Sequence, residues 1–103
     1  MDMSNIIKQA RDFQQKMSRV QEELAQKTVT STVGGGMLTV SMNGRYELLS
    51  VEIEKEVIDP EDPGLLQDLI VSGVNDVMRK AQEMAQAEMS RLTGGVNIPG
   101  LFR

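Results

Sequence analysis

A regular three-four spacing of apolar residues opens the chain and constrains its fold more than any other feature. Neither Gly nor Pro interrupts this series, which consists of Met3, Ile6, Ala10, Phe13, Met17, Val20 and Leu24. The spacing predicts a helix over residues 3–26 with a narrow apolar seam, typical of helices that pair with another helix. At 1.5 Å per residue this helix is about 36 Å long. We expect it to project from the body and lie along a second helix; the alternative is an ordinary helix packed on the core.

Chain length and composition limit the size of the core. The 103 residues support one domain, and a chain this short buries only a modest apolar core. With two Phe, one Tyr and eight Met, the core must consist mainly of aliphatic and thioether side chains. Because two long helices leave little of the chain for compact packing, we expect a homodimer.

The absence of Cys and His narrows the chemistry open to the protein. These side chains supply the usual nucleophiles, proton shuttles and transition-metal ligands of enzymes. We therefore expect no enzymatic activity, no cofactor and no metal site. No apolar run approaches the length of a membrane span, and the N-terminus lacks a charged segment followed by an apolar signal core, so we expect a cytoplasmic protein.

Three short segments after the first helix have the alternating pattern of strands. They cover residues 27–33, 37–42 and about 45–53. Gly34 to Gly36 form the first connection, and Asn43-Gly44 predicts a two-residue type I′ turn, which requires positive φ at both positions. In the first segment Val29, Ser31 and Val33 fall on one side and the threonines on the other, and in the second Leu38, Val40 and Met42 form the one buried face.

The alternation in the third segment changes phase. Tyr46 and Leu48 share one face, whereas Leu49, Val51 and Ile53 share the other. Two explanations fit this pattern. Either both faces are covered in a dimer, which we favour, or a bulge near Leu49 shifts the phase.

A second long helix is predicted over residues 63–93. Asp62 suits the N-cap and Pro63 the first turn, while Gly94 and Gly95 provide a C-terminal stop. Helical spacing relates the apolar residues Leu66, Leu69, Ile70, Gly73, Val74, Val77, Ala81, Met84, Ala85 and Leu92. The broad apolar face of residues 65–78 should lie on the sheet, and the more polar residues 81–92 should extend outward beside the first helix.

Two clusters invite functional interpretations that we reject. The glycines at 34–36 lead into a strand, whereas a phosphate-binding loop leads into a helix and usually ends in Lys-Ser or Lys-Thr. The acidic cluster of Asp59, Glu61, Asp62 and Asp68 lacks the central Gly and terminal Glu of a calcium loop. We interpret the first as a hairpin loop and the second as a solvated linker and helix start.

The net charge of −4 is unevenly distributed. Residues 1–33 carry five basic and four acidic side chains, and residues 70–103 carry four and three, whereas residues 55–69 carry one and five. Any contact with nucleic acid must therefore be made by the helical segments. On the first helix, an arc of about 140° contains Lys8, Arg11, Lys16 and Arg19, together with Asp12 and Glu23. Mixed signs of this kind usually mean a solvated face with weak ion pairs.

Several segments in order resemble the YbaB/EbfC family of nucleoid-associated proteins. The resemblance covers nearly the whole chain and includes the Met- and Gln-rich heptad helix. It also rests on Gly34-Gly35-Gly36 before Leu38-Thr39-Val40, on Asn43-Gly44, on Val51-Glu52-Ile53, on Asp68-Leu69-Ile70 to Asn75-Asp76 with Arg79-Lys80-Ala81, and on Leu92-Thr93-Gly94-Gly95.

Membership would imply an α+β fold with an α-β-β-β-α subunit, a small antiparallel three-stranded sheet and a tweezer-like homodimer that binds duplex DNA in the nucleoid. Residues 1–95 would form the single domain and residues 96–103 a short tail. Because the family's helical arms are associated with DNA contact, the resemblance favours as DNA-binding candidates Lys8, Arg11, Lys16, Arg19, Arg79, Lys80 and Arg91.

The acidic net charge favours a different class of function. Coiled-coil-like arms on a β body would suit a protein-interaction module, in which Met-rich seams hold another protein or an unfolded chain as holdase chaperones do. A gel shift at about 0.1 M salt, run beside an aggregation-suppression assay, separates this alternative from DNA binding.

Overall fold

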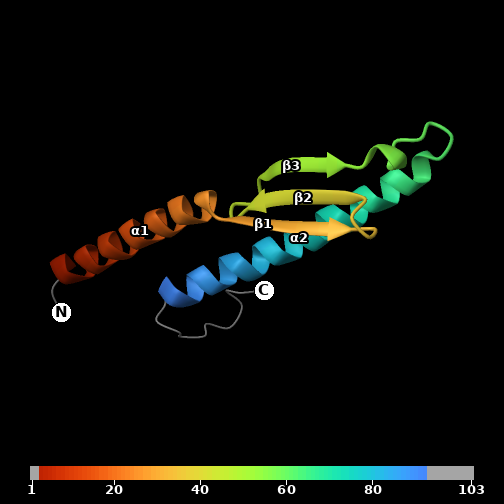
Figure 1. The fold of residues 1–103 in the computed structure, drawn as a ribbon. Coiled ribbons are helices and arrows are strands. Elements are labelled where there is room, and N and C mark those ends of the chain that lie inside the picture. The colour runs from red at the N-terminus through yellow and green to blue at the C-terminus, as the bar shows by residue number, and fades with distance from the viewer. Residues whose placement is uncertain (1–2, 93–103) are drawn as a thin grey trace.

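The computed structural model describes residues 3–92 and has the predicted α+β order (Figure 1). Its elements are helix α1 (Met3–Gln26), strands β1 (Thr28–Val33), β2 (Leu38–Asn43) and β3 (Leu48–Ile53), the short 3₁₀ helix η1 (Lys55–Val57) and helix α2 (Pro63–Leu92). The predicted stop at Gly94-Gly95, the domain boundary at residue 95 and the tail of residues 96–103 lie outside the described residues.

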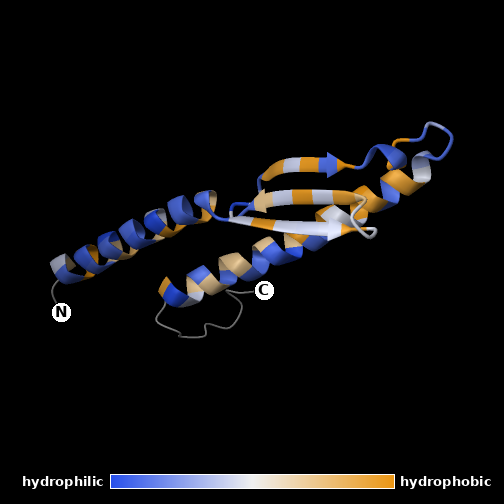
Figure 2. Ribbon diagram, in the orientation of Figure 1, coloured by the Kyte–Doolittle hydropathy of each residue, from blue (hydrophilic) through white to orange (hydrophobic). Residues whose placement is uncertain are grey.

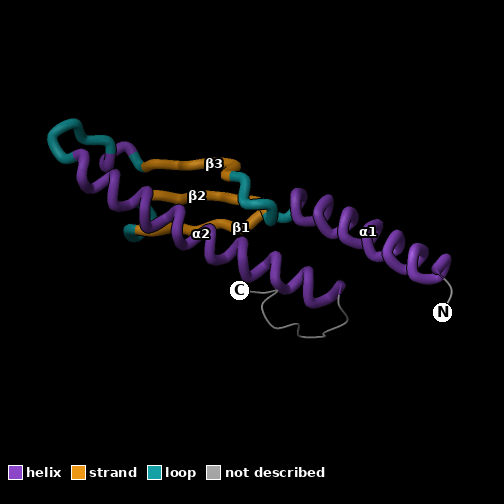
Figure 3. Tube along the Cα trace, turned by 180° about the vertical axis from the view of Figure 1, so that it is seen from behind, coloured by secondary structure: helices purple, strands orange, loops and turns teal. Residues whose placement is uncertain are grey.

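The three strands form one antiparallel sheet in the order β1-β2-β3, and α2 crosses one face of it (Figure 3). The register pairs Val29 with Met42, Ser31 with Val40, and Val33 with Leu38, so that all six side chains share that face. The core consists of buried side chains from this face, from η1 and from α2, namely Leu38, Val40, Met42, Val57, Leu69, Val77 and Ala81. The first half of α2 therefore lies on the sheet, as its broad apolar face predicts.

A bulge in β3 explains the change of phase seen in the sequence. Ser41 pairs with Ser50 and Met42 with Leu48, which leaves Leu49 without a partner on β2. The bulge thus explains the change in the alternation of apolar side chains along β3. The side chains of β3 are uncovered within the single chain, where Leu48, Leu49 and Val51 are 48%, 52% and 43% exposed. Their covering in a dimer stays a prediction.

The turn between β2 and β3 differs from the predicted type I′ turn. Positive φ occurs at Tyr46 (65°) and not at Asn43 or Gly44. The amide of Tyr46 donates to Asn43 O (3.2 Å) and the amide of Asn43 to Glu47 O (3.0 Å), which gives a three-residue loop ending in a left-handed residue. The third strand accordingly begins at Leu48 instead of near residue 45.

Gly44 is needed for its small size, because it lies against the end of α1. Its amide donates to Leu24 O (2.8 Å), and a Cβ at this position would lie 2.9 Å from the same oxygen and 2.7 Å from Leu24 Cδ2. Asn43 completes the junction, since its side-chain oxygen accepts hydrogen bonds from the amides of Arg45 and Glu47. The turn therefore fixes the base of α1 to the sheet.

Substitution of Gly44 by Ala is expected to lower the free energy of unfolding by about 1–3 kcal/mol, because the added methyl group overlaps backbone that cannot easily move. Thermal and denaturant melts measure the change. Gly64→Ala is the control, because a Cβ there meets nothing closer than 3.8 Å, and Ala is the better helix former. A Gly44→Ala variant as stable as the wild type would contradict the assigned role of Gly44.

The molecule is elongated because α1 projects from the body (Figure 1). Its extents are 70 × 24 × 16 Å and its radius of gyration is 19.1 Å, against about 13 Å for a compact domain of 100 residues. Only Val20 and Leu24 of α1 are buried, and these lie where the end of α2 runs beside it. The seam residues Met3, Ile6 and Phe13 are 69%, 44% and 51% exposed. The expected pairing of α1 with a second helix thus holds for its last turns alone within the described chain. Neither described helix is long and apolar enough to cross a membrane.

Candidate nucleic-acid interface

The seven predicted DNA-binding residues fall into three groups along the molecule. Lys8 and Arg11 lie on the free half of α1, and Arg79 and Lys80 lie on the body beside β1. The fold brings together the other three, Lys16, Arg19 and Arg91, although 72 positions separate Arg19 from Arg91 in the sequence. The sequence pattern therefore did not show which of the predicted cations lie together.

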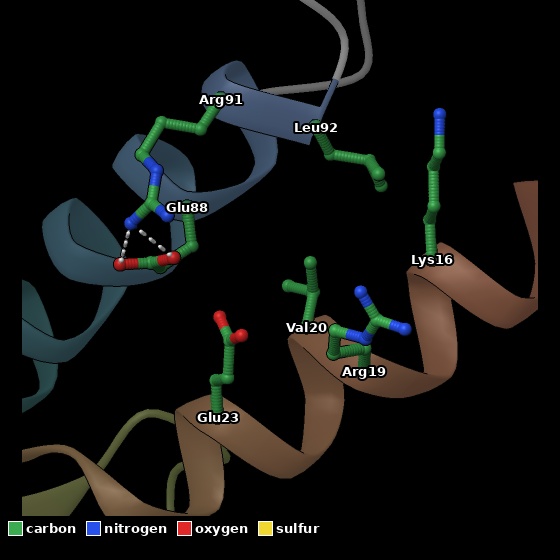
Figure 4. A pocket seen from close by; sticks show the side chains of 7 residues that line it. All are labelled: Lys16, Arg19, Val20, Glu23, Glu88, Arg91 and Leu92. Atoms are coloured by element: carbon green, nitrogen blue, oxygen red, sulfur yellow. Dashed lines mark hydrogen bonds and ion pairs between the residues drawn. The ribbon is translucent and has the colours of Figure 1, made fainter.

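Lys16, Arg19 and Arg91 line a cleft between the end of α2 and the second half of α1 (Figure 4). We call this the inter-arm cleft; its lining residues are Lys16, Arg19, Val20, Glu23, Glu88, Arg91 and Leu92. An adjoining hollow is lined by Arg19, Arg91 and also Lys27, which follows directly on α1. Four cations, three from the two helices and Lys27 from the residue after α1, thus lie around one region at the base of the arms. The carboxylates of Glu22, Glu23 and Glu88 line the same two hollows.

Glu88 is the buried carboxylate of this region. The residue is 5% exposed; it accepts a hydrogen bond from Lys27 Nζ and two from Arg91 Nη1, at 3.1 and 3.0 Å. The hydrogen bond from Lys27, helped by the charge of Arg91, holds the pKa of Glu88 below its ordinary value despite the opposing effect of burial. Glu88 is therefore an anion that ties the end of α1 to α2.

Neither Glu88 nor Lys27 was among the predicted site residues. A signal for Glu88 exists, because it follows Val77 and Ala81 at helical spacing and so falls on the buried face of α2. A charged side chain on such a face requires a partner. The partner Lys27 lies 61 positions away, however, and the spacing does not point to it.

Arg79 and Lys80 are already engaged by groups of the same chain. Arg79 donates to Asp76 (2.9 Å) and Glu83 (2.8 Å), and the bond to Asp76 is the main cause that raises the pKa of Arg79. Lys80 Nζ donates to the carbonyl oxygen of Thr30 (2.9 Å) at the edge of the sheet. These two cations are therefore less available for phosphate than those of α1.

The four cations of α1 form no ion pair with any other residue of the part that the structure describes. By helical geometry their mean direction lies about 160° from that of the apolar seam. A partner that covered the seam would leave Lys8, Arg11, Lys16 and Arg19 open to solvent. The free part of α1 thus has one apolar face and one basic face.

The glycine cluster and the acidic cluster lie in a hairpin loop and in the linker and start of α2, respectively, as the sequence indicated. Gly34 to Gly36 connect β1 to β2, with φ of 66°, 66° and 100°. Within residues 3–92, no group of three or more acidic side chains is arranged to hold a metal ion. Asp59, Glu61 and Asp62 lie in the exposed connection before α2.

Comparison with known proteins gives a consistent result. The model of the YbaB/EbfC DNA-binding family matches residues 1–96. A nucleoid-associated protein of Syntrophobacter fumaroxidans is 57% identical over 94% of this chain and 88% of its own length. One from Pelotomaculum thermopropionicum is 52% identical over 98% and 96%. The crystal structure of uncharacterized protein HP0035 from Helicobacter pylori matches with a TM-score of 0.82 and 27% identity, over 90% of this chain and 98% of that one.

Proposed function

The chain belongs to the YbaB/EbfC DNA-binding family, and we propose that it is a non-enzymatic homodimeric protein of the cytoplasmic nucleoid that grips duplex DNA with its helical arms. The observation that carries this proposal is the basic face of α1, which projects into solvent with four cations that have no ion pair within the described residues. Such side chains suit the phosphate backbone, which is recognised largely without regard to base sequence.

The location of the acidic residues supports contact through the arms. Residues 55–69, which carry five acidic side chains and one basic side chain, form η1, the following connection and the start of α2. This region lies at the end of the molecule opposite α1 (Figure 1). Because interactions between exposed charges are screened over about 8–10 Å, the acidic end has little effect on phosphate held at the arms.

An uncovered apolar surface beneath β3 supports the homodimer. Helix α2 packs on β1 and β2, and its polar flank, with Lys80 bonded to Thr30, faces β1. Its other flank, with the exposed Ile70, and the core-side face of β3, with the exposed Val51, remain open in the single chain. Figure 2 shows hydrophobic residues along β3 and the first half of α2. Contiguous apolar surface of this kind is typical of an interface. A second copy would cover it and would also bring a second pair of arms to the DNA.

Duplex DNA titrated at several salt concentrations tests the function. With six to eight phosphates neutralised by the arms of two subunits, we expect the association constant to fall by on the order of a thousand-fold between 50 and 200 mM salt. Fluorescence anisotropy of a labelled duplex measures it. The absence of binding at the lowest salt, or binding that is insensitive to salt, would contradict contact with the phosphate backbone.

The exposed apolar seam at Met3, Ile6 and Phe13 is the observation that favours the interaction-module alternative. A holdase would use this surface to keep an unfolded client from aggregating. Light scattering of a heat-denatured client with and without the protein, on the sample used for the DNA titration, decides between the two. Protection from aggregation without DNA binding would favour the alternative.

A further inference from the structure

We infer that the inter-arm cleft is a phosphate-binding site in which Glu88 competes with the phosphate group for Arg91. The inference rests on the proposed DNA binding and adds to it an internal anion that weakens the interaction. The occupant is a phosphodiester group of the DNA backbone, held between the two helices of one arm pair.

The first line of support is the convergence of cations on the cleft. Lys16 and Arg19 line it from α1, together with the carboxylate of Glu23, and Arg91 lines it from α2 with its guanidinium turned toward Glu88 (Figure 4). The side chain of Arg91 is 70% exposed, so that a phosphate can approach it from solvent. Both hydrogen bonds to Glu88 use Nη1, and a guanidinium has five N–H donors, so donors remain for a second anion.

The second line of support is the position of Glu88. Its side chain is 6% exposed, whereas the side chains of the cations that it binds, Lys27 and Arg91, are 42% and 70% exposed. The buried carboxylate therefore neutralises part of the charge of two cations whose own side chains are open to solvent beside the cleft. Carboxylate and phosphate are both anions that attract a guanidinium, so the charge of Glu88, already bound to Arg91, weakens the attraction of Arg91 for a phosphate group.

Glu88 consequently has two opposed effects. It stabilises the junction between α1 and α2 through Lys27, and it lowers the positive potential that a phosphate meets in the cleft. Removal of its charge should loosen the junction and at the same time strengthen DNA binding. A residue with a structural role alone would weaken both.

The Glu88→Gln variant tests this inference by the duplex titration described above. We expect its DNA affinity to rise about ten-fold at about 0.1 M salt. The slope of the logarithm of the association constant against that of the salt concentration should steepen by about two per dimer, one for each released Arg91. Glu22→Gln is the matched control, because Glu22 is an exposed carboxylate that lines the adjoining hollow but forms no ion pair in the described chain. It reports the effect of one negative charge lost near the same cations without any release of Arg91, and a rise of less than about three-fold is expected.

A second pair of variants separates the competition from general electrostatics. In an Arg91→Gln background, Glu88→Gln should give no more than the rise seen with Glu22→Gln. In the wild-type background, Arg91→Gln should cost less affinity than Arg19→Gln, because Glu88 already neutralises Arg91. This comparison needs no change at Glu88, so it remains decisive if the Glu88→Gln variant does not fold.

Three results would overturn the inference. These are a Glu88→Gln affinity equal to that of Glu22→Gln, a gain that persists without Arg91, and a loss from Arg91→Gln as large as that from Arg19→Gln. Binding by the wild-type protein in the same titrations would leave the proposed function intact in each case. A wild-type protein that binds no DNA would instead contradict the proposed function itself.

Discussion

Replacement of Lys8 and Arg11 together by Glu is expected to weaken DNA binding by on the order of a hundred-fold at about 0.1 M salt. Both side chains are exposed on the free half of α1, and neither has an ion pair in the described chain. In a homodimer the double variant removes four cations and adds four anions to the surface proposed to face the phosphates. The plot of the logarithm of the association constant against the logarithm of the salt concentration should become less steep by about four, since each lost phosphate contact removes about 0.9 from the slope.

The stability of this double variant should remain near that of the wild type, because no buried group or ion pair is disturbed. Anisotropy titrations measure the affinity, and thermal melts and size-exclusion chromatography monitor the fold and assembly. Lys8→Glu alone is compared with Lys55→Glu, which makes the same change in charge on η1, away from the arms. Equal affinities of these two single variants would remove α1 from the proposed interface.

Substitution of Val51 by Asp is expected to convert the proposed homodimer to a monomer. Val51 lies on the core-side face of β3, opposite Val40, but α2 does not cover it. A charge placed in an apolar interface costs several kcal/mol. A cost of about 4 kcal/mol corresponds to a dissociation constant raised about a thousand-fold. DNA affinity should fall with it, because a monomer presents a single pair of arms.

Sedimentation of the wild type and variants over a range of micromolar concentrations measures the assembly. Ser50→Asp is the control, because Ser50 pairs with Ser41 and points to the opposite, hydroxyl-rich face of the sheet, where Ser41 contacts Thr30. This control should remain a dimer. If Ser50→Asp dissociates while Val51→Asp does not, the subunits associate through the other face of the sheet.

The elements of the fold were predictable because their signals are local. The apolar spacing of the first helix predicted bounds of 3–26, as observed, and Pro63 marked the start of the second. The alternation at Leu38, Val40 and Met42 identified the buried face of β2. The turn at Asn43-Gly44 was predicted incorrectly because Gly44 is needed for close contact with Leu24, 20 positions away, and not for positive φ.

The candidate site was predictable only in outline. The arc of cations on α1 follows from helical geometry, and the resemblance to a DNA-binding family favours these cations as DNA-binding candidates. Which cations are available depends on partners that the fold supplies. Asp76 and Glu83 engage Arg79 on the same helix, but the contact of Lys80 with Thr30 and that of Lys27 with Glu88 span 50 and 61 positions.

The sequence by itself determined the two helices, the faces of β1 and β2 and the separation of a basic arm from an acidic end, because each depends on periodicity or on charge along the chain. Tertiary structure alone decided where the arm is fastened, how the cations converge on the inter-arm cleft and that a buried Glu88 lies among them. These features depend on contacts between residues far apart in the chain, and a periodic pattern contains no information about such distances.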